Sequence, residues 1–186
     1  MRQTVTSNIS TRLMTTIDYL EKQYNHAFDM VKFGETKNTT LIAFNGAIII
    51  GMTKLANDTQ NIYVHWYLLF VILMCALSIF ICLSALVAKI KHTSNNISSH
   101  RNDNLLYYAT LAQMTHEELI DSLKTQYQCE GSNINHEKDL AKQTIITSQI
   151  ACRKFKLFNI AISFTFSGIL TPLSLIIYKI YLDQDK

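Results

Sequence analysis

The stretch from Trp66 to Ala88 contains 23 residues without a charge, a glycine or a proline. At about 1.5 Å per residue, a helix of this length extends for roughly 35 Å, which exceeds the ~30 Å of hydrocarbon in a bilayer. Tyr63 and Tyr67 lie near one end of the stretch, and Lys89 and Lys91 follow the other. Aromatic and basic residues in these places are typical of the two membrane interfaces. The sequence therefore predicts a transmembrane helix over residues 66–88.

An earlier apolar stretch, residues 39–55, is just long enough to form another span. Within it Ala43, Ala47 and Gly51 recur every four residues, and such a stripe of small residues lets another helix approach closely. Asn45 is polar at the same depth, so we expect its side chain to face protein rather than lipid. We interpret this stretch as the first crossing.

Residues 157–181 form the third predicted crossing and carry a polar stripe along an otherwise apolar helix. Asn159, Ser163, Ser167 and Thr171 recur every four residues and would share one face. We expect this stripe to pack between the spans in the resting protein and to line a leak after assembly. The alternative is ordinary helix packing through small polar residues.

Two other rows of residues predict packing faces at helical spacing. In the central span the smaller residues recur at intervals of three and four: Cys75, Ser78, Cys82 and Ala85. The N-terminal region carries a heptad-like seam: Leu13, Ile17, Leu20, Tyr24, Ala27 and Val31. This seam predicts either a helix packed within its own domain or self-association of two chains, and both alternatives stay open.

The polar segment 89–156 is predicted to contain two main helices. Thr115 and Glu118 have the spacing of a capping box, which opens a helix with Leu119 and Leu123 on one face. A second helix is expected to begin near Asn135. Because no breaker separates it from the last apolar run, we expect it to continue into the membrane.

The distribution of Lys and Arg predicts the orientation. Residues 1–38 hold five such residues and residues 89–156 hold nine, whereas residues 56–65 hold none. These counts place the N-terminus and the polar segment in the cytoplasm. We therefore predict an all-α membrane protein with three transmembrane helices and a cytoplasmic helical domain built from the N-terminal helix and the segment between spans two and three. The predicted cytoplasmic parts are the N-terminal helix, 1–38, and the ligand-sensing segment, 89–156. The predicted transmembrane helices are 39–55, 66–88 and 157–181, with an outer loop at 56–65 and an outer tail at 182–186.

Several classes of chemistry have no support in the sequence. There is no GxxxxGK[ST] or GxGxxG loop for phosphate and no GxSxG elbow. His116 and His136 are each followed by Glu, but neither continues as HExxH, and the four cysteines lack CxxC spacing. The net charge of +3 is too small to indicate a nucleic-acid partner. The sequence therefore predicts no enzyme, metal site or cofactor.

Some polar and aromatic residues are candidates for binding a small anionic ligand. Lys37, Arg153 and Lys154 belong to a basic ring at the cytoplasmic membrane face, which also has the simpler explanation of contact with anionic lipid. Tyr107 and Tyr108 are candidates for stacking on a base, although adjacent tyrosines are also common at the edge of a core. Gln143 has the paired donor and acceptor that a pyrimidine edge requires, although such residues are often simply solvated.

The succession of motifs resembles the membrane effector of the Pycsar antiphage systems, the PycTM domain. Three stretches carry the resemblance: FGETKN with LIAFNG at 33–46, LLYY with MTHEELI at 105–120, and DLAKQ with KFKLFNIA at 139–161. The resemblance covers about residues 12–178 and makes Glu35 and Lys37 the best-matched polar positions. It implies a multi-pass protein of the bacterial inner membrane, encoded beside a cyclase that makes cyclic UMP or cyclic CMP.

The resemblance also implies a function. Such an effector binds the cyclic pyrimidine nucleotide during infection, membrane integrity fails, and the cell stops growing before phage matures. We further expect the chain to form a homo-oligomer within the lipid bilayer. Two alternatives remain: a ligand-independent membrane protein of the holin or toxin kind, and a membrane scaffold that recruits a soluble partner.

Overall fold

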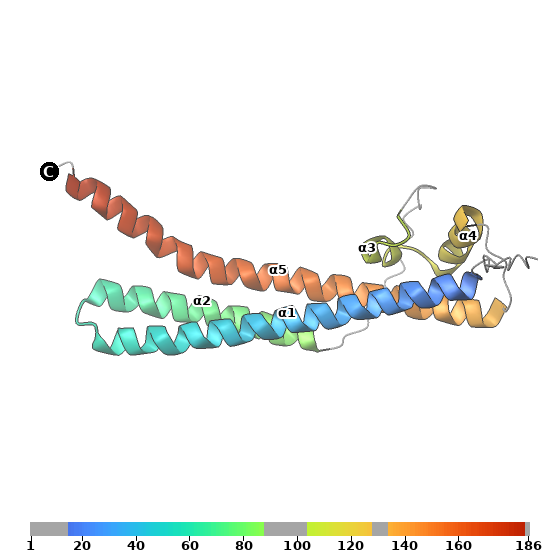
Figure 1. Ribbon diagram of the computed structural model, residues 1–186. Coiled ribbons are helices and arrows are strands. Elements are labelled where there is room, and N and C mark those ends of the chain that lie inside the picture. The colour runs from blue at the N-terminus through green and yellow to red at the C-terminus, as the bar shows by residue number, and fades with distance from the viewer. Residues whose placement is uncertain (1–14, 88–103, 128–133, 185–186) are drawn as a thin grey trace, which may run out of the picture.

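The computed structural model describes residues 15–87, 104–127 and 134–184, and every regular element within them is a helix. The helices are α1 (Thr16–Asp58), α2 (Ile62–Leu86), α3 (Tyr108–Leu111), α4 (His116–Tyr127) and α5 (Ile134–Gln184). Helices α1 and α5 are long rods that run side by side in the same direction, and α2 returns along α1 (Figure 1). The prediction of an all-α fold is confirmed for this part of the chain.

Helix α1 is continuous over 43 residues and includes the whole of the first apolar stretch, residues 39–55. It begins at a capping box in which the Thr15 hydroxyl accepts from the backbone N–H of Asp18, at 3.3 Å. Gly34 does not interrupt it. A Cβ at this position would lie 3.2 Å from Cβ of Lys154. The glycine therefore permits α5 to approach α1 closely rather than ending the helix.

Helices α1 and α2 are each long and apolar enough to cross a membrane. Most of the large apolar side chains along α2 are exposed, among them Leu73 and Phe80, as is expected of a surface in contact with lipid. The buried face of α2 contains Cys75, Ser78, Cys82 and Ala85, each exposed by at most 3%. The packing face predicted for the central span is thus confirmed.

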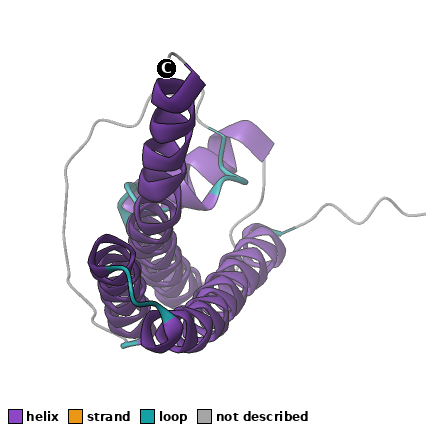
Figure 2. Ribbon diagram, turned by 90° about the vertical axis from the view of Figure 1, so that its left-hand side faces the viewer, coloured by secondary structure: helices purple, strands orange, loops and turns teal. Residues whose placement is uncertain are grey.

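Helix α5 packs against the α1–α2 hairpin and then leaves it. Gly168 is a position of close approach to α2, because a Cβ there would lie 3.0 Å from Cβ of Met74. Beyond it the helix continues through Pro172 to Gln184. Figure 1 and the end-on view in Figure 2 both show this C-terminal part bending away from the joined ends of α1 and α2. The continuity of α5 from the polar segment into the last apolar run is as predicted.

The small-residue stripe of Ala43, Ala47 and Gly51 receives no neighbouring helix among the described residues of this chain, so its role in close helix packing stays a prediction. All three residues are exposed, and a Cβ at Gly51 would meet nothing within 4 Å. Helix α1 instead turns Leu41 and Asn45 toward its neighbours. The physical reason is that the hydrogen-bonding capacity of Asn45 favours the interior more strongly than small side chains do.

The polar stripe of α5 also faces outward. Asn159, Ser163, Ser167 and Thr171 are all exposed rather than packed between the spans of one chain. Ser163 and Thr171 donate their hydroxyl protons to the carbonyls of Asn159 and Ser167, so these two side chains need no other helix. The buried row lies on another face of α5: Ala161, Thr165 and Gly168.

The N-terminal halves of α1 and α5, together with α3 and α4, form what we call the helical domain. Its apolar core consists of eight residues: Leu20, Leu105, Leu111, Met114, Leu119, Leu123, Ala141 and Ile145. The predicted capping box is present, since the N–H of Thr115 donates to the Glu118 carboxylate at 2.8 Å. Of the seam residues, Leu20 and Ala27 are buried within the chain's own helices, which favours the intramolecular alternative; Leu13 lies outside the described residues.

Candidate functional site

Five of the seven predicted ligand-binding residues meet where the helical domain joins the apolar helices. They come from α1, from α5 and from the start of α3, and three phenylalanines join them. We call this group the junction cluster: Phe33, Glu35, Lys37, Tyr107, Tyr108, Lys154, Phe155 and Phe158.

An ion pair between α1 and α5 forms one side of the junction cluster. The Lys154 ammonium donates to a carboxylate oxygen of Glu35 at 2.9 Å. The lysine side chain is only 5% exposed, whereas the glutamate side chain is 49% exposed. The pair therefore neutralises a buried positive charge and leaves part of the carboxylate in contact with solvent.

Lys37 forms the centre of the cluster and lies over three aromatic rings. Its ammonium nitrogen is 4.6 Å from the ring centre of Phe33 and 5.5 Å from those of Phe155 and Phe158. These distances are within the range of cation–π attraction. The described residues place no carboxylate within ion-pair distance of this ammonium. Lys37 therefore carries a positive charge that an anionic ligand can approach.

Two tyrosines extend the aromatic surface toward α3. The ring centres of Tyr107 and Tyr108 are 5.1 Å apart, and that of Tyr108 is 5.5 Å from Phe155. Burial raises the pKa of Tyr108 above its usual value, and the neighbouring Tyr107 and Cys152 add to the rise. Burial also raises the pKa of the Cys152 thiol, so this cysteine is a poor nucleophile at neutral pH. The cluster thus offers rings and a cation rather than a reactive group.

One predicted ligand residue, Gln143, lies away from the cluster. Gln143 is exposed on α5, eleven residues before Lys154, which is about 16 Å along the helix. Arg153 is half-buried and precedes Lys154 directly in the chain. The three phenylalanines were missed by the sequence analysis. Their signal was available, because Phe33, Phe155 and Phe158 lie within four residues of Lys37 or Lys154 along the chain.

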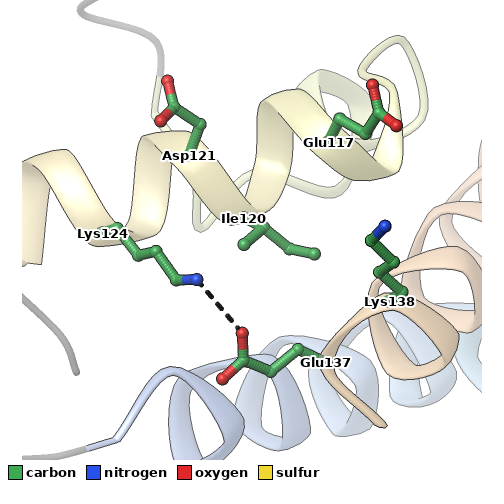
Figure 3. A pocket seen from close by; sticks show the side chains of 6 residues that line it. All are labelled: Glu117, Ile120, Asp121, Lys124, Glu137 and Lys138. Atoms are coloured by element: carbon green, nitrogen blue, oxygen red, sulfur yellow. Dashed lines mark ion pairs between the residues drawn. The ribbon is translucent and has the colours of Figure 1, made fainter. Parts of the chain in front are cut away.

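A concave site lies between α4 and the first turns of α5 (Figure 3). It is an open hollow of about 360 Å³ lined by Glu117, Ile120, Asp121, Lys124, Glu137 and Lys138. The Lys124 ammonium lies 3.3 Å from the buried carboxylate of Glu137 and ties α4 to α5. Three carboxylates outnumber two ammonium groups here, so the hollow suits an anion less well than the junction cluster does. Among the described residues no group of acidic, histidine or cysteine side chains could hold a metal ion.

A polar network joins all three long helices inside the apolar region. The Asn45 amide donates to the Ser78 hydroxyl at 2.9 Å, and Ser78 donates to the carbonyl of Ala161 at 2.8 Å. The Thr165 hydroxyl lies 3.0 Å from both Asn45 Oδ1 and Ser78 Oγ. The predicted inward orientation of Asn45 is confirmed. Each helix contributes one polar side chain, so the network holds α5 against the hairpin.

Replacement of Ser78 by alanine is expected to destabilise the protein by about 1–2 kcal/mol, because it leaves the Asn45 amide without its acceptor in apolar surroundings. Thermal unfolding of the full chain in detergent, followed by circular dichroism, measures the change. Ser84→Ala on the same helix is the matched control, since the Ser84 hydroxyl donates only to the Ile81 carbonyl of its own helix. Equal effects of the two substitutions would show that the inter-helix network adds no stability.

Comparison with known proteins identifies the family. The family model described as the Pycsar effector protein domain, PycTM, matches residues 19–180. The curated proteins and the solved structures give no significant match. The matched region contains the junction cluster, the polar network, nearly all of α1 and the whole of α2. This chain therefore belongs to the PycTM family of Pycsar effectors, which act in antiphage defence.

Proposed function

We propose that this effector binds cyclic UMP or cyclic CMP at the junction cluster and responds by disrupting the bacterial inner membrane. The nucleotide would come from a partner cyclase during infection, and the loss of membrane integrity would stop growth before phage matures. One observation carries the proposal: predicted ligand residues from α1, α3 and α5 gather where the two long helices pass from the helical domain into apolar sequence.

The chemistry of the cluster suits a small anion that carries a flat ring. Lys37 has no competing carboxylate among the described residues and can attract a cyclic phosphate. The rings of Tyr107 and Phe33 are about half exposed and can stack on a pyrimidine base. The exposed part of the Glu35 carboxylate can accept a hydrogen bond from the ribose hydroxyl. Each part of the nucleotide thus has a matching side chain nearby.

Two unbroken helices would transmit binding to the bilayer. The junction cluster takes residues from both α1 and α5, and each helix continues from it without interruption. A ligand that fits one spacing of these helices better than another shifts the population between the two arrangements. The apolar helices would then move with the helical domain.

The arrangement in the membrane is part of the proposal. We place α1, α2 and the C-terminal part of α5 across the inner membrane, with the N-terminus and helical domain in the cytoplasm, as the distribution of Lys and Arg predicts. The outward stripes on α1 and α5 would meet other copies of the chain in a homo-oligomer. In that assembly, the polar stripe of α5 would line the leak.

The test uses purified full-length protein with cyclic UMP, cyclic CMP, cyclic AMP and cyclic GMP in turn. We expect one cyclic pyrimidine nucleotide, at a hundredfold excess over its Kd, to raise the melting temperature by about 5–10 °C. The same nucleotide is expected to release dye from vesicles that contain the protein. Lys37→Gln should remove both responses, because the phosphate loses its charged partner.

Lys54→Gln is the matched control, since Lys54 is an exposed lysine at the far end of α1. Release of dye without nucleotide and without a thermal shift would contradict the proposal and favour the holin-like alternative. Absence of both responses to every nucleotide would also contradict it and favour a membrane scaffold that recruits a soluble partner.

A further inference from the structure

The buried contact between α1 and α5, which we call the α1–α5 seam, contains many polar side chains for two long parallel helices. Gly34 faces Lys154 near the junction cluster, and Asn45 faces Thr165 inside the apolar region. The partner on α5 has the same offset in residue number at both places, so the register is constant along the seam. The buried polar side chains along these helices are Thr16, Gln23, Asn38, Asn45, Glu137, Thr144, Thr147, Ser148, Lys154 and Thr165.

Three of these buried side chains leave a polar atom without a hydrogen-bond partner among the described residues. They are Oε1 of Gln23, Oδ1 of Asn38 and Oγ of Ser148. Gln23 and Asn38 do use their amide nitrogens, which donate to the carbonyls of Leu105 and Gly34. The unpartnered oxygens lie at three levels along α1 and α5, from the helical domain to the start of the apolar region.

Ser148 belongs to a buried row of α5. Ala141, Thr144, Ser148 and Ala151 are fully buried at intervals of three and four residues, and Ala141 packs in the same core as Leu20 of α1. Alanine at position 148 would fill nearly the same space without an unsatisfied hydroxyl. Packing alone therefore does not require the polar residue, and the observed seam is less stable than an apolar one would be.

We infer that the α1–α5 seam is a two-state element. Its closed form, seen here, has only marginal stability because of the unpartnered oxygens of Gln23, Asn38 and Ser148. In the open form the two helices rotate or separate until these three side chains reach water. The gain in hydration offsets part of the packing that is lost, so the two forms lie close in free energy. This inference rests on the proposed function for its trigger, a ligand at the junction cluster, which contacts both helices.

The test replaces the unpartnered groups by apolar residues of similar size, Asn38→Leu and Ser148→Ala, alone and together. The double variant is expected to raise the melting temperature of the ligand-free full chain by at least about 2–4 °C. Hydrogen exchange of the seam amides should slow, because the open form becomes rarer. The nucleotide concentration for half-maximal dye release should rise roughly tenfold or more, since the ligand must now overcome a more stable closed form.

Thr39→Val and Lys142→Met are matched controls, because both residues are exposed on the same two helices and lie outside the junction cluster and the polar stripe of α5. If the double variant is no more stable than the wild type, or fails to fold, the inference is overturned. It is also overturned if stability rises while the response to nucleotide stays unchanged. If the wild type responds to no nucleotide, the proposed function fails, and hydrogen exchange of the ligand-free protein still decides whether the seam opens.

Discussion

Replacing Ser163 and Ser167 together by leucine is expected to abolish nucleotide-triggered dye release while leaving nucleotide binding unchanged. Both residues are exposed on the outer face of α5, so leucine creates no clash within the chain. In the proposed assembly this face borders the leak, and two leucines would replace the polar lining by an apolar constriction that excludes water. Dye release from vesicles measures the first property and isothermal titration with the cyclic nucleotide measures the second.

Thr53→Leu on α1 is the matched control for this double substitution. The Thr53 hydroxyl is exposed and donates to the carbonyl four residues earlier, as the Ser163 hydroxyl does, but it lies on another helix. The control is expected to release dye normally. If the double variant also releases dye, the polar stripe does not line the leak, and the proposed role of this face has to be given up.

The outward orientation of this stripe marks the limit of reasoning from sequence. Helix positions were predictable, because the capping box at Thr115, the uncharged run after Trp66 and the absence of a breaker before the last span are local signals. The orientation of each helix about its axis was harder. In a bilayer, lipid and protein interior are both apolar, so a periodic stripe defines a face without showing which environment it meets.

In the polar network, the inward orientation of one residue was predictable and that of its partner was not. Asn45 was predictable as an inward residue, because a carboxamide is costly in lipid. Its partner Thr165 was not, because its hydroxyl can equally be satisfied by the carbonyl four residues earlier, and that carbonyl, of Ala161, is indeed 3.4 Å away. Only the packing of three helices selects Thr165 over the exposed Ser163 and Ser167.

The candidate site shows a similar division. Glu35, Lys37, Tyr107, Tyr108 and Lys154 were selected by residue type and by resemblance, and the structure brings all five together. Which of these residues contact one another was not predictable. The sequence could not show that Glu35 would pair with Lys154, because that contact depends on the close approach of α5 at Gly34.

Substitution of Glu35 by alanine is expected to destabilise the protein by about 2–3 kcal/mol, whereas Lys154→Met should cost less than about 1 kcal/mol. The asymmetry follows from burial. Removal of Glu35 leaves the ammonium of Lys154 unpaired at 5% exposure, while removal of Lys154 leaves a carboxylate that water already reaches. The unbranched apolar side chain of methionine also occupies the space that the methylene groups of Lys154 leave. Unfolding of the full chain in detergent, followed by circular dichroism, gives both values.

The double variant Glu35→Ala/Lys154→Met is the decisive comparison. It should be more stable than Glu35→Ala alone, because no buried charge is left without a partner. The exposed pair of Asp29 and Lys32, 3.9 Å apart, provides the control, and Asp29→Ala is expected to change stability by less than about 0.5 kcal/mol. If Lys154→Met proves as costly as Glu35→Ala, the ion pair itself stabilises the junction. A ligand phosphate that drew Lys154 away from Glu35 would then weaken the contact between α1 and α5.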